Sequence, residues 1–192
     1  MEVTLIIMAY LLGSVPSGYV LGRSVGVDVR KAGSGNVGAT NVARVVGKTQ
    51  GVLTLVADAA KGFIPVFAVL QLDLSLPVTM LVGVAAFLGH LYPIFLLFKG
   101  GKGVATALGV FLAYAPLVTL ILLGVFLIVA WISRLVSLSS ITAAVAAPIA
   151  FWFAAYPPPV VQTGTFVAAM IILRHRSNIK RLLAGTEPRF NA

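Results

Sequence analysis

The sequence contains no cysteine, and only 5 of its 192 residues are acidic. The absence of cysteine excludes a disulfide framework, a zinc-finger site and a thiol nucleophile. Charged residues make up 10% of the chain and apolar residues 59%, whereas soluble proteins have about 25% and about 45–50%. The mean hydropathy is +1.04. This composition excludes a cytosolic enzyme, a secreted disulfide scaffold and a disordered tail, and it predicts a polytopic membrane protein.

The scarcity of acids also limits the chemistry. Only Asp28, Asp58 and Glu187 lie on or near the predicted inner side of the membrane, and they are scattered. No paired carboxylates are available to hold Mg²⁺, so we expect no metal and no cofactor. Neither His90 nor His175 has an Asp five residues later, and no Gly-x-Ser-x-Gly sequence occurs. The sequence therefore favours anion binding over general-base chemistry.

Long apolar runs predict an all-α helical bundle with about seven transmembrane helices, some of them short. A span needs about 20 apolar residues. The run from Val104 to Ser133 is too long for one span, and Ala115-Pro116 interrupts it. The predicted spans are Val3–Leu21, Val52–Leu72, Leu76–Phe98, Val104–Tyr114, Leu117–Ser133, Val136–Ala155 and Val160–Leu173. We treat residues 1–192 as a single integral membrane domain.

The distribution of basic residues supports this number of spans. With the N-terminus outside and the C-terminus in the cytoplasm, every Lys and Arg except Lys61 falls in an inner loop or the inner tail. This is the asymmetry that membrane proteins show. Five long spans with two short hydrophobic elements is the nearest alternative.

Residues 33–44 form the most conspicuous polar segment. Its glycines permit positive φ angles and a close approach of a ligand to the backbone. Hydroxyl and amide groups, successive backbone N–H groups and an arginine fork suit an anion. A flexible interhelical loop is the alternative. The candidate phosphate-binding residues here are Gly33, Ser34, Gly35, Asn36, Gly38, Thr40, Asn41 and Arg44.

Further polar clusters occur on the same predicted side. The segment Lys99–Gly103 is a basic glycine loop that opens a helix at Val104, which favours anions; its candidate residues are Gly101, Lys102 and Gly103. His175 and Asn178 share a face if this segment is helical. Ser140 belongs to a serine cluster that follows Arg134. Membrane-edge anchoring is the alternative for the lysines and arginines.

Two other features lie within the predicted spans. Asp58 and Lys61 are three residues apart, and ionisable residues inside a membrane tend to pair. We therefore expect a structural ion pair. His90 is expected to pack or hydrogen-bond so that it orients the Lys99–Gly103 loop.

Three segments together, Gly33–Arg44, Gly89–Thr106 and His175–Leu183, resemble the cytoplasmic motifs of the bacterial acyl-phosphate:glycerol-3-phosphate acyltransferase family (PlsY). The resemblance spans nearly the whole chain, and the sequences GSGNVGATN and KGGKGVAT are long and specific. It implies the same seven-helix fold in the bacterial inner membrane, with the active site facing the cytoplasm. The residues that match the family's functional positions are Ser34, Arg44, Lys102, Ser140, His175 and Asn178.

The resemblance implies that acyl phosphate and glycerol 3-phosphate give lysophosphatidic acid and inorganic phosphate. The expected partners are these two substrates and membrane lipid, with no nucleic acid and no metal. From the residue inventory we expect the glycine N–H groups, Ser34 and Lys102 to hold the acyl-phosphate head. Arg44, Ser140, His175 and Asn178 are then expected to orient glycerol 3-phosphate, and a substrate phosphate oxygen serves as base.

Two other functions fit parts of the pattern. A transporter or channel for a phosphorylated anion would also have a basic interior and broken helices. It would place its site near the midplane and often carry an internal repeat, and the sequence shows no repeat. A non-catalytic binder of anionic lipid would need the basic residues but not the Ser, Asn and Gly pattern.

Overall fold

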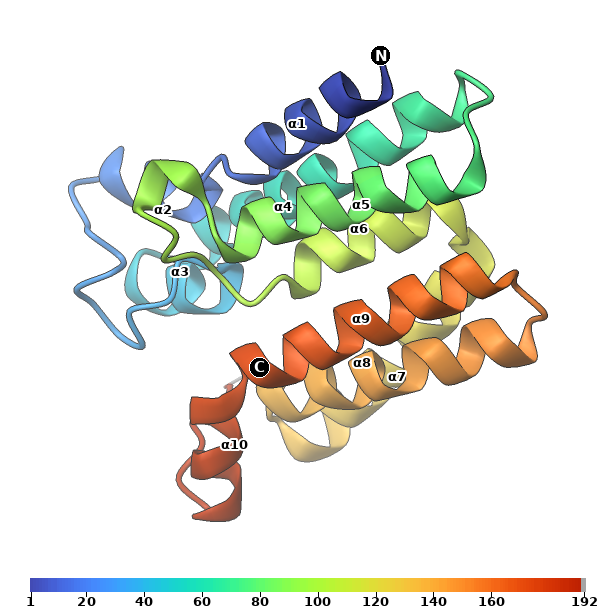
Figure 1. The fold of residues 1–192 in the computed structure, drawn as a ribbon. Coiled ribbons are helices and arrows are strands. Elements are labelled where there is room, and N and C mark those ends of the chain that lie inside the picture. Colours follow the sequence, from blue (N-terminus) through green and yellow to red (C-terminus); the bar gives the residue numbers. More distant parts are fainter. Residues whose placement is uncertain (191–192) are drawn as a thin grey trace. The chain divides into compact units, whose positions relative to one another are not determined.

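The computed structural model describes residues 1–190, which form ten α-helices, one short 3₁₀ helix and no strand. The chain divides into two compact units (Figure 1). The first comprises Met1–Tyr114, and the second begins at Ala115. Each unit is described separately.

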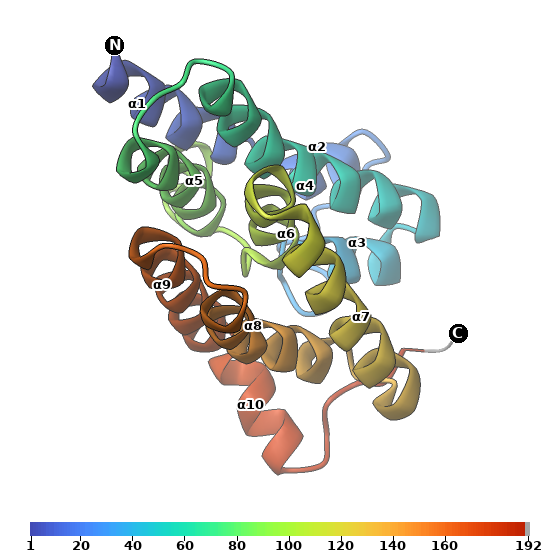
Figure 2. The same cartoon turned by 90° about the vertical axis from the view of Figure 1, so that its right-hand side faces the viewer.

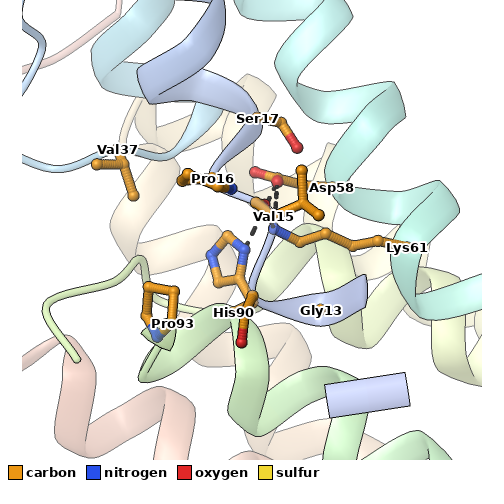
Figure 3. A pocket seen from close by; sticks show the side chains of 10 residues that line it. Gly13, Val15, Pro16, Ser17, Val37, Asp58, Lys61, His90 and Pro93 are labelled. Carbon is orange, nitrogen blue, oxygen red and sulfur yellow. Dashed lines mark hydrogen bonds and ion pairs between the residues drawn. The ribbon is translucent and has the colours of Figure 1, made fainter. Parts of the chain in front are cut away.

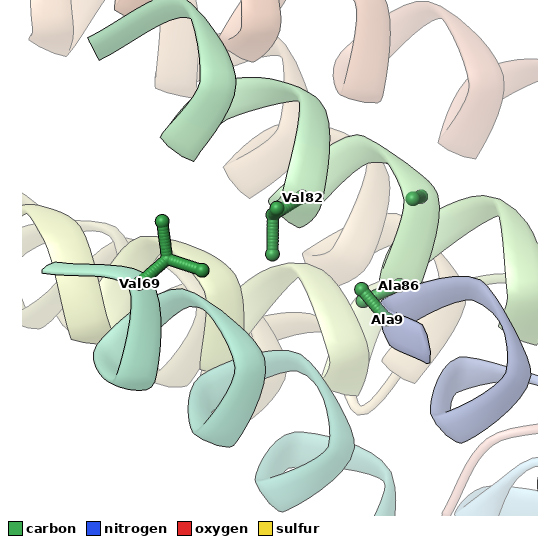
Figure 4. Packing of buried hydrophobic residues seen from close by; sticks show 5 residues of the cluster. Ala9, Val69, Val82 and Ala86 are labelled. Atoms are coloured by element: carbon green, nitrogen blue, oxygen red, sulfur yellow. The ribbon is translucent and has the colours of Figure 1, made fainter. Parts of the chain in front are cut away.

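The first unit contains six α-helices and the 3₁₀ helix. α1 and α5 lie side by side, as do α4 and α6, in both views (Figures 1 and 2). The bounds are α1 Glu2–Gly13, α2 Ser17–Arg23, α3 Ala39–Val45, α4 Lys48–Leu70, α5 Leu76–Leu91, η1 Ile94–Leu96 and α6 Val104–Tyr114. Ala9, Val69, Val82 and Ala86 are buried where α1, α4 and α5 meet (Figure 4).

Glycines allow these helices to approach closely. A side chain at Gly13 of α1 would overlap the backbone of Ala86 in α5, and one at Gly109 of α6 would overlap the carbonyl of Ala59 in α4. Membrane helices depend on such small residues because lipid supplies no hydrophobic force between them. The sequence of α1, α4, α5 and α6 therefore specifies tight backbone packing.

The second unit contains four helices, α7 Pro116–Ser133, α8 Val136–Phe153, α9 Pro158–Arg174 and α10 Arg176–Leu183. α8 packs against both α7 and α9. Arg134, with φ of 58°, ends α7 in the left-handed conformation. The segment after α10 returns to the turn between α7 and α8, where the Phe190 backbone N–H donates to the Arg134 carbonyl over 3.0 Å.

The helices occupy all seven predicted spans. By length and composition, five helical segments of the described chain are candidate membrane spans, and α6 and α9 are shorter apolar helices. The all-helical membrane fold is thus confirmed, with five long and two short segments. The predicted orientation of the termini stays a prediction.

Several boundaries differ from those predicted. The first span is interrupted at residues 14–16, because Pro16 supplies no backbone N–H. α5 ends at Leu91 before Pro93, and Leu97 and Phe98 have positive φ. After α9, which ends at Arg174, the basic segment forms the separate helix α10.

Candidate active site

The loop of residues 33–38 is held by one buried side chain. Asn41, which is 3% exposed, accepts a hydrogen bond from the Ser34 backbone N–H at 2.8 Å. Its amide nitrogen contacts the carbonyls of Val29, Ala32 and Asn36 at 3.1, 3.2 and 2.8 Å. Asn41, at the start of α3, thus holds four backbone groups between Val29 and Asn36. Its role as a direct phosphate ligand stays a prediction.

The glycines of this loop have conformations that other residues rarely adopt. Gly33 and Gly35 have φ of 59° and 70°, and a side chain at Gly33 would overlap the Asn41 side chain. Asn36 accepts from the Gly38 N–H at 2.8 Å. The loop therefore has a defined conformation, held by side-chain hydrogen bonds, rather than being a flexible connection.

The exposed groups around the loop are the ones suited to a ligand. Ser34, Thr40 and Arg44 are all exposed. Within residues 1–190, the Ser34 hydroxyl and the Arg44 guanidinium make no hydrogen bond or ion pair with the protein. Both are available to an anion from the aqueous side.

The second loop, Lys99–Gly103, is pinned to the end of α5. The backbone N–H groups of Gly100 and Gly101 donate to the carbonyls of Leu91 and His90, each over 3.1 Å. A side chain at Gly101 would overlap the His90 imidazole. His90 thus packs and hydrogen-bonds against this loop as predicted, and its role in orienting the loop stays a prediction. Lys102 is half-buried and lies two residues before α6, which begins at Val104.

A buried ionic cluster lies between α4 and α5 of the first unit. Lys61 Nζ is 2.9 Å and His90 Nδ1 is 3.6 Å from Asp58 Oδ1 (Figure 3), so the predicted ion pair is confirmed. A small cavity beside the cluster is also lined by Val37 of the first loop and by Pro93. The cavity thus adjoins the first loop through Val37, and His90, which also lines it, lies against Gly101 of the second loop.

In the second unit, His175 lies at the junction of α9 and α10. It is 2% exposed, and its Nδ1 is 2.8 Å from the Ile171 carbonyl. A carbonyl oxygen only accepts, so this contact places a proton on Nδ1 and orients the ring. The predicted residue is thus fixed by the preceding helical turn.

Asn178 is held by an acid that the sequence analysis did not select. Its amide donates to Glu187 Oε1 at 2.6 Å, and Arg181 Nε lies 2.7 Å from Glu187 Oε2. Burial raises the pKa of Glu187, but the nearby Ser137 hydroxyl and the hydrogen bonds from Asn178 and Arg181 lower it more, so the net pKa is below its ordinary value. In the sequence, only the position of Glu187 as a lone acid among the basic residues of the C-terminal segment could have indicated this contact.

The serine cluster is buried on α8. The Ser139 and Ser140 hydroxyls donate to the carbonyls of Leu135 and Val136 at 2.9 and 2.8 Å. Because each hydroxyl proton is used within the helix, Ser140 has lone pairs left to accept a hydrogen bond.

The predicted residues therefore fall into two groups. The first unit contains Ser34, Arg44, Lys102 and the loop glycines, and the second contains Ser140, His175 and Asn178. Among the described residues there is no group of three or more His, Asp or Glu that could hold a metal ion.

Known proteins resemble the chain over almost its whole length. The model of the family described as glycerol-3-phosphate acyltransferase matches residues 3–185. The glycerol-3-phosphate acyltransferase of Trichlorobacter lovleyi is 51% identical, covering 96% of this chain and 95% of that protein. The one of Geobacter metallireducens is 54% identical, covering 100% of this chain and 98% of that protein.

Two solved structures of PlsY, an integral membrane glycerol 3-phosphate acyltransferase, are each 49% identical to this chain. The glycerol 3-phosphate form has a TM-score of 0.95, covering 99% of this chain and 96% of that one. The lysophosphatidic acid form has a TM-score of 0.93, covering 99% and 95%. A fold built on closely packed membrane helices, two glycine loops and full-length similarity agree: the chain belongs to the PlsY family of integral membrane glycerol-3-phosphate acyltransferases.

Proposed function

We propose that this enzyme transfers a fatty acyl group from acyl phosphate to the 1-hydroxyl of glycerol 3-phosphate. The hydroxyl oxygen forms a bond to the acyl carbon, and the bond from that carbon to the phosphate oxygen breaks. The hydroxyl proton ends on phosphate, so the products are lysophosphatidic acid and inorganic phosphate. The acceptor follows from the family, and the donor is the further step argued below.

The choice of donor rests on one observation: the acidic side chains near the predicted inner side are already paired with basic ones. Among residues 1–190, the three acids nearest the predicted inner side are all bound to cations. Arg30 holds Asp28 over 2.8 Å, and this hydrogen bond keeps the pKa of Asp28 well below its usual range. Lys61 pairs with Asp58, and Arg181 with Glu187. None of them is poised to remove a proton near neutral pH.

Because none of the described acids near the predicted inner side is a free carboxylate base, the site suits an activated donor. An acyl phosphate is a mixed anhydride with a good leaving group, so positioning the two substrates supplies much of the rate. In this proposal, Ser34, Lys102 and the N–H groups of Gly33, Gly35 and Gly101 bind the phosphate of the donor. They stabilise the charge that develops on it as it leaves.

Glycerol 3-phosphate is assigned to the remaining polar groups. Arg44 supplies a guanidinium fork for a phosphate, while Ser140, His175 and Asn178 supply hydrogen-bonding contacts that orient the substrate. The proton of the attacking hydroxyl goes to a phosphate oxygen of a substrate. We place the enzyme in the bacterial inner membrane with this chemistry on the cytoplasmic side, because the basic loops lie on one predicted side.

The test is a comparison of donors with the purified protein in lipid. Glycerol 3-phosphate is supplied with acyl phosphate, acyl-coenzyme A or acyl carrier protein, and lysophosphatidic acid and released phosphate are measured. We expect product from acyl phosphate alone. Product from either thioester, with none from acyl phosphate, would replace the proposed donor. Uptake of phosphorylated substrate into vesicles without product would support a transporter instead.

A further inference from the structure

Three ionisable side chains that the proposed chemistry does not use meet inside the first unit. Asp58 and Lys61 come from α4 and His90 from α5, and they are 2%, 5% and 6% exposed. Figure 3 shows both basic side chains directed at the Asp58 carboxylate. Ionisable groups within apolar spans are costly. The cluster needs a reason beyond the packing of these helices.

Stability alone does not supply that reason. Removing two charges from a polar environment costs about as much as their attraction returns, and apolar replacements of buried ion pairs are often neutral or stabilising. α4 and α5 already have glycines and apolar residues with which to pack. The contacts that the cluster makes with the backbone are more informative.

The first of these contacts is at the interruption of the first span. Lys61 Nζ donates to the Val15 carbonyl at 2.8 Å, between the end of α1 and the start of α2. Backbone groups released from a helix in a membrane must find partners within the protein. α2 then carries Gly18, where any side chain would overlap the Val37 carbonyl. The ammonium group therefore fixes a bend on which the first loop rests.

The second contact is at the Lys99–Gly103 loop. The Nδ1 edge of His90 faces Asp58 at 3.6 Å, while its Nε2 edge lies against Gly101. The His90 carbonyl also accepts from the Gly101 N–H at 3.1 Å. The imidazole thus stands between a fixed carboxylate and the residue next to Lys102.

We propose that Asp58, Lys61 and His90 are positioning residues for acyl transfer. They hold the interrupted first span and the Lys99–Gly103 loop in the geometry that binds a substrate phosphate. The proposal rests on the phosphate-binding role given to that loop above. It adds that residues which touch no substrate set where Lys102 and the loop N–H groups lie.

The first test is His90→Phe, which keeps a ring against Gly101 and keeps the backbone carbonyl but loses the contact with Asp58. We expect KM for one phosphate substrate to rise about tenfold or more, because small misplacements of binding groups cost that much or more. The affected substrate should be the one whose KM is raised by Lys102→Ala. Asp73→Asn, an exposed carboxylate-to-amide change, is the control and should have the kinetics of the wild type.

The second test is the double variant Asp58→Asn with Lys61→Met, which leaves no unpaired buried charge. Positioning predicts the same rise in KM with little change of Tm in detergent, whereas a merely structural pair predicts an unchanged KM. Wild-type kinetics in both variants overturns the proposal, and so does failure of both to fold. Wild-type protein is assayed alongside: if it makes no lysophosphatidic acid from acyl phosphate, the proposed function fails instead.

Discussion

Asparagine side chains in the motifs of this chain bind the protein's own backbone and side chains. Asn41 contacts three carbonyls and one N–H around the first loop, and Asn178 donates to Glu187. Each bond removes freedom from a segment that also carries exposed groups such as Ser34 and Arg44. At this scale, the polar residues divide into those that shape the site and those that face the substrates.

In the proposed mechanism, charge stabilisation by Lys102 contributes more to the rate than proton removal by any side chain. We expect Lys102→Ala to lower kcat/KM by about a hundredfold or more, because it removes a charge from the developing phosphate. His175→Ala should also reduce kcat/KM, without a steep new dependence on pH. Both are measured from pH 6 to pH 9 by lysophosphatidic acid formation, with Tm in detergent as the control for folding.

The opposite pattern would indicate a histidine base. Full kcat/KM in Lys102→Ala, together with loss of activity in His175→Ala alone and a steep pH profile in the wild type, would replace the mechanism proposed here. The contact of His175 Nδ1 with the Ile171 carbonyl is compatible with an orienting role, and the kinetics decide between the two.

Among the elements, the crossing of α4 and α6 matters most to the second loop. A side chain at Gly62 of α4 would overlap the Thr106 carbonyl in α6, and one at Gly109 would overlap the Ala59 carbonyl in α4. α6 starts at Val104, directly after the loop. Any outward movement of α6 therefore moves Gly103 and Lys102 as well.

We expect Gly109→Ala to destabilise the protein by about 1–3 kcal/mol, the usual cost of overpacking, and to reduce acyl transfer. The matched control is Gly124→Ala in α7, where a side chain would meet nothing within 4 Å. That change should leave the activity unaltered and stabilise the helix by about 0.5–1 kcal/mol. Tm in detergent and kcat/KM are the measurements. Equal behaviour of the two variants would show that the close crossing is unimportant.

For the whole molecule, charge asymmetry is the dominant feature. The net charge of +9 comes from basic residues that the seven helical segments place on one predicted side. The family match from residue 3 to residue 185 runs through both compact units. We accordingly keep the expectation that they act as one acyltransferase domain.

The absence of cysteine makes the orientation simple to test. Gln71, between α4 and α5, and Thr186, after α10, are both exposed. In intact cells, a membrane-impermeant thiol reagent should label Gln71→Cys, and it should label Thr186→Cys only after the membrane is opened. The positive-inside distribution is the reason. Reversed labelling would place the chemistry on the outer face, and equal labelling would indicate a different number of spans.

Local patterns were sufficient for much of this description. Apolar runs and Ala115-Pro116 predicted the positions of the helical segments, because a span depends on consecutive residues. The three-residue spacing of Asp58 and Lys61 predicted their ion pair, since it brings neighbouring turns together. The loops around Gly33 and Lys99 were recognisable because glycine and polar residues are concentrated there.

The contacts that hold these loops depend on residues far apart in the chain. Lys61 reaches the Val15 carbonyl across 46 residues, and Asn41 the Val29 carbonyl across 12. The interruption at residues 14–16 was missed although Pro16, which lies between Ser14 and Ser17, was a local signal for it.

By itself, the sequence determined that the chain is a helical membrane protein of this family, with two glycine loops and few acids. Composition and short-range spacing suffice for that, because each helix is stabilised by its own backbone hydrogen bonds. Only the tertiary structure decided that Glu187 holds Asn178 and that His90 stands between Asp58 and Gly101. Those contacts exist only after separate helices and loops have packed, and no local pattern encodes which side chains then meet.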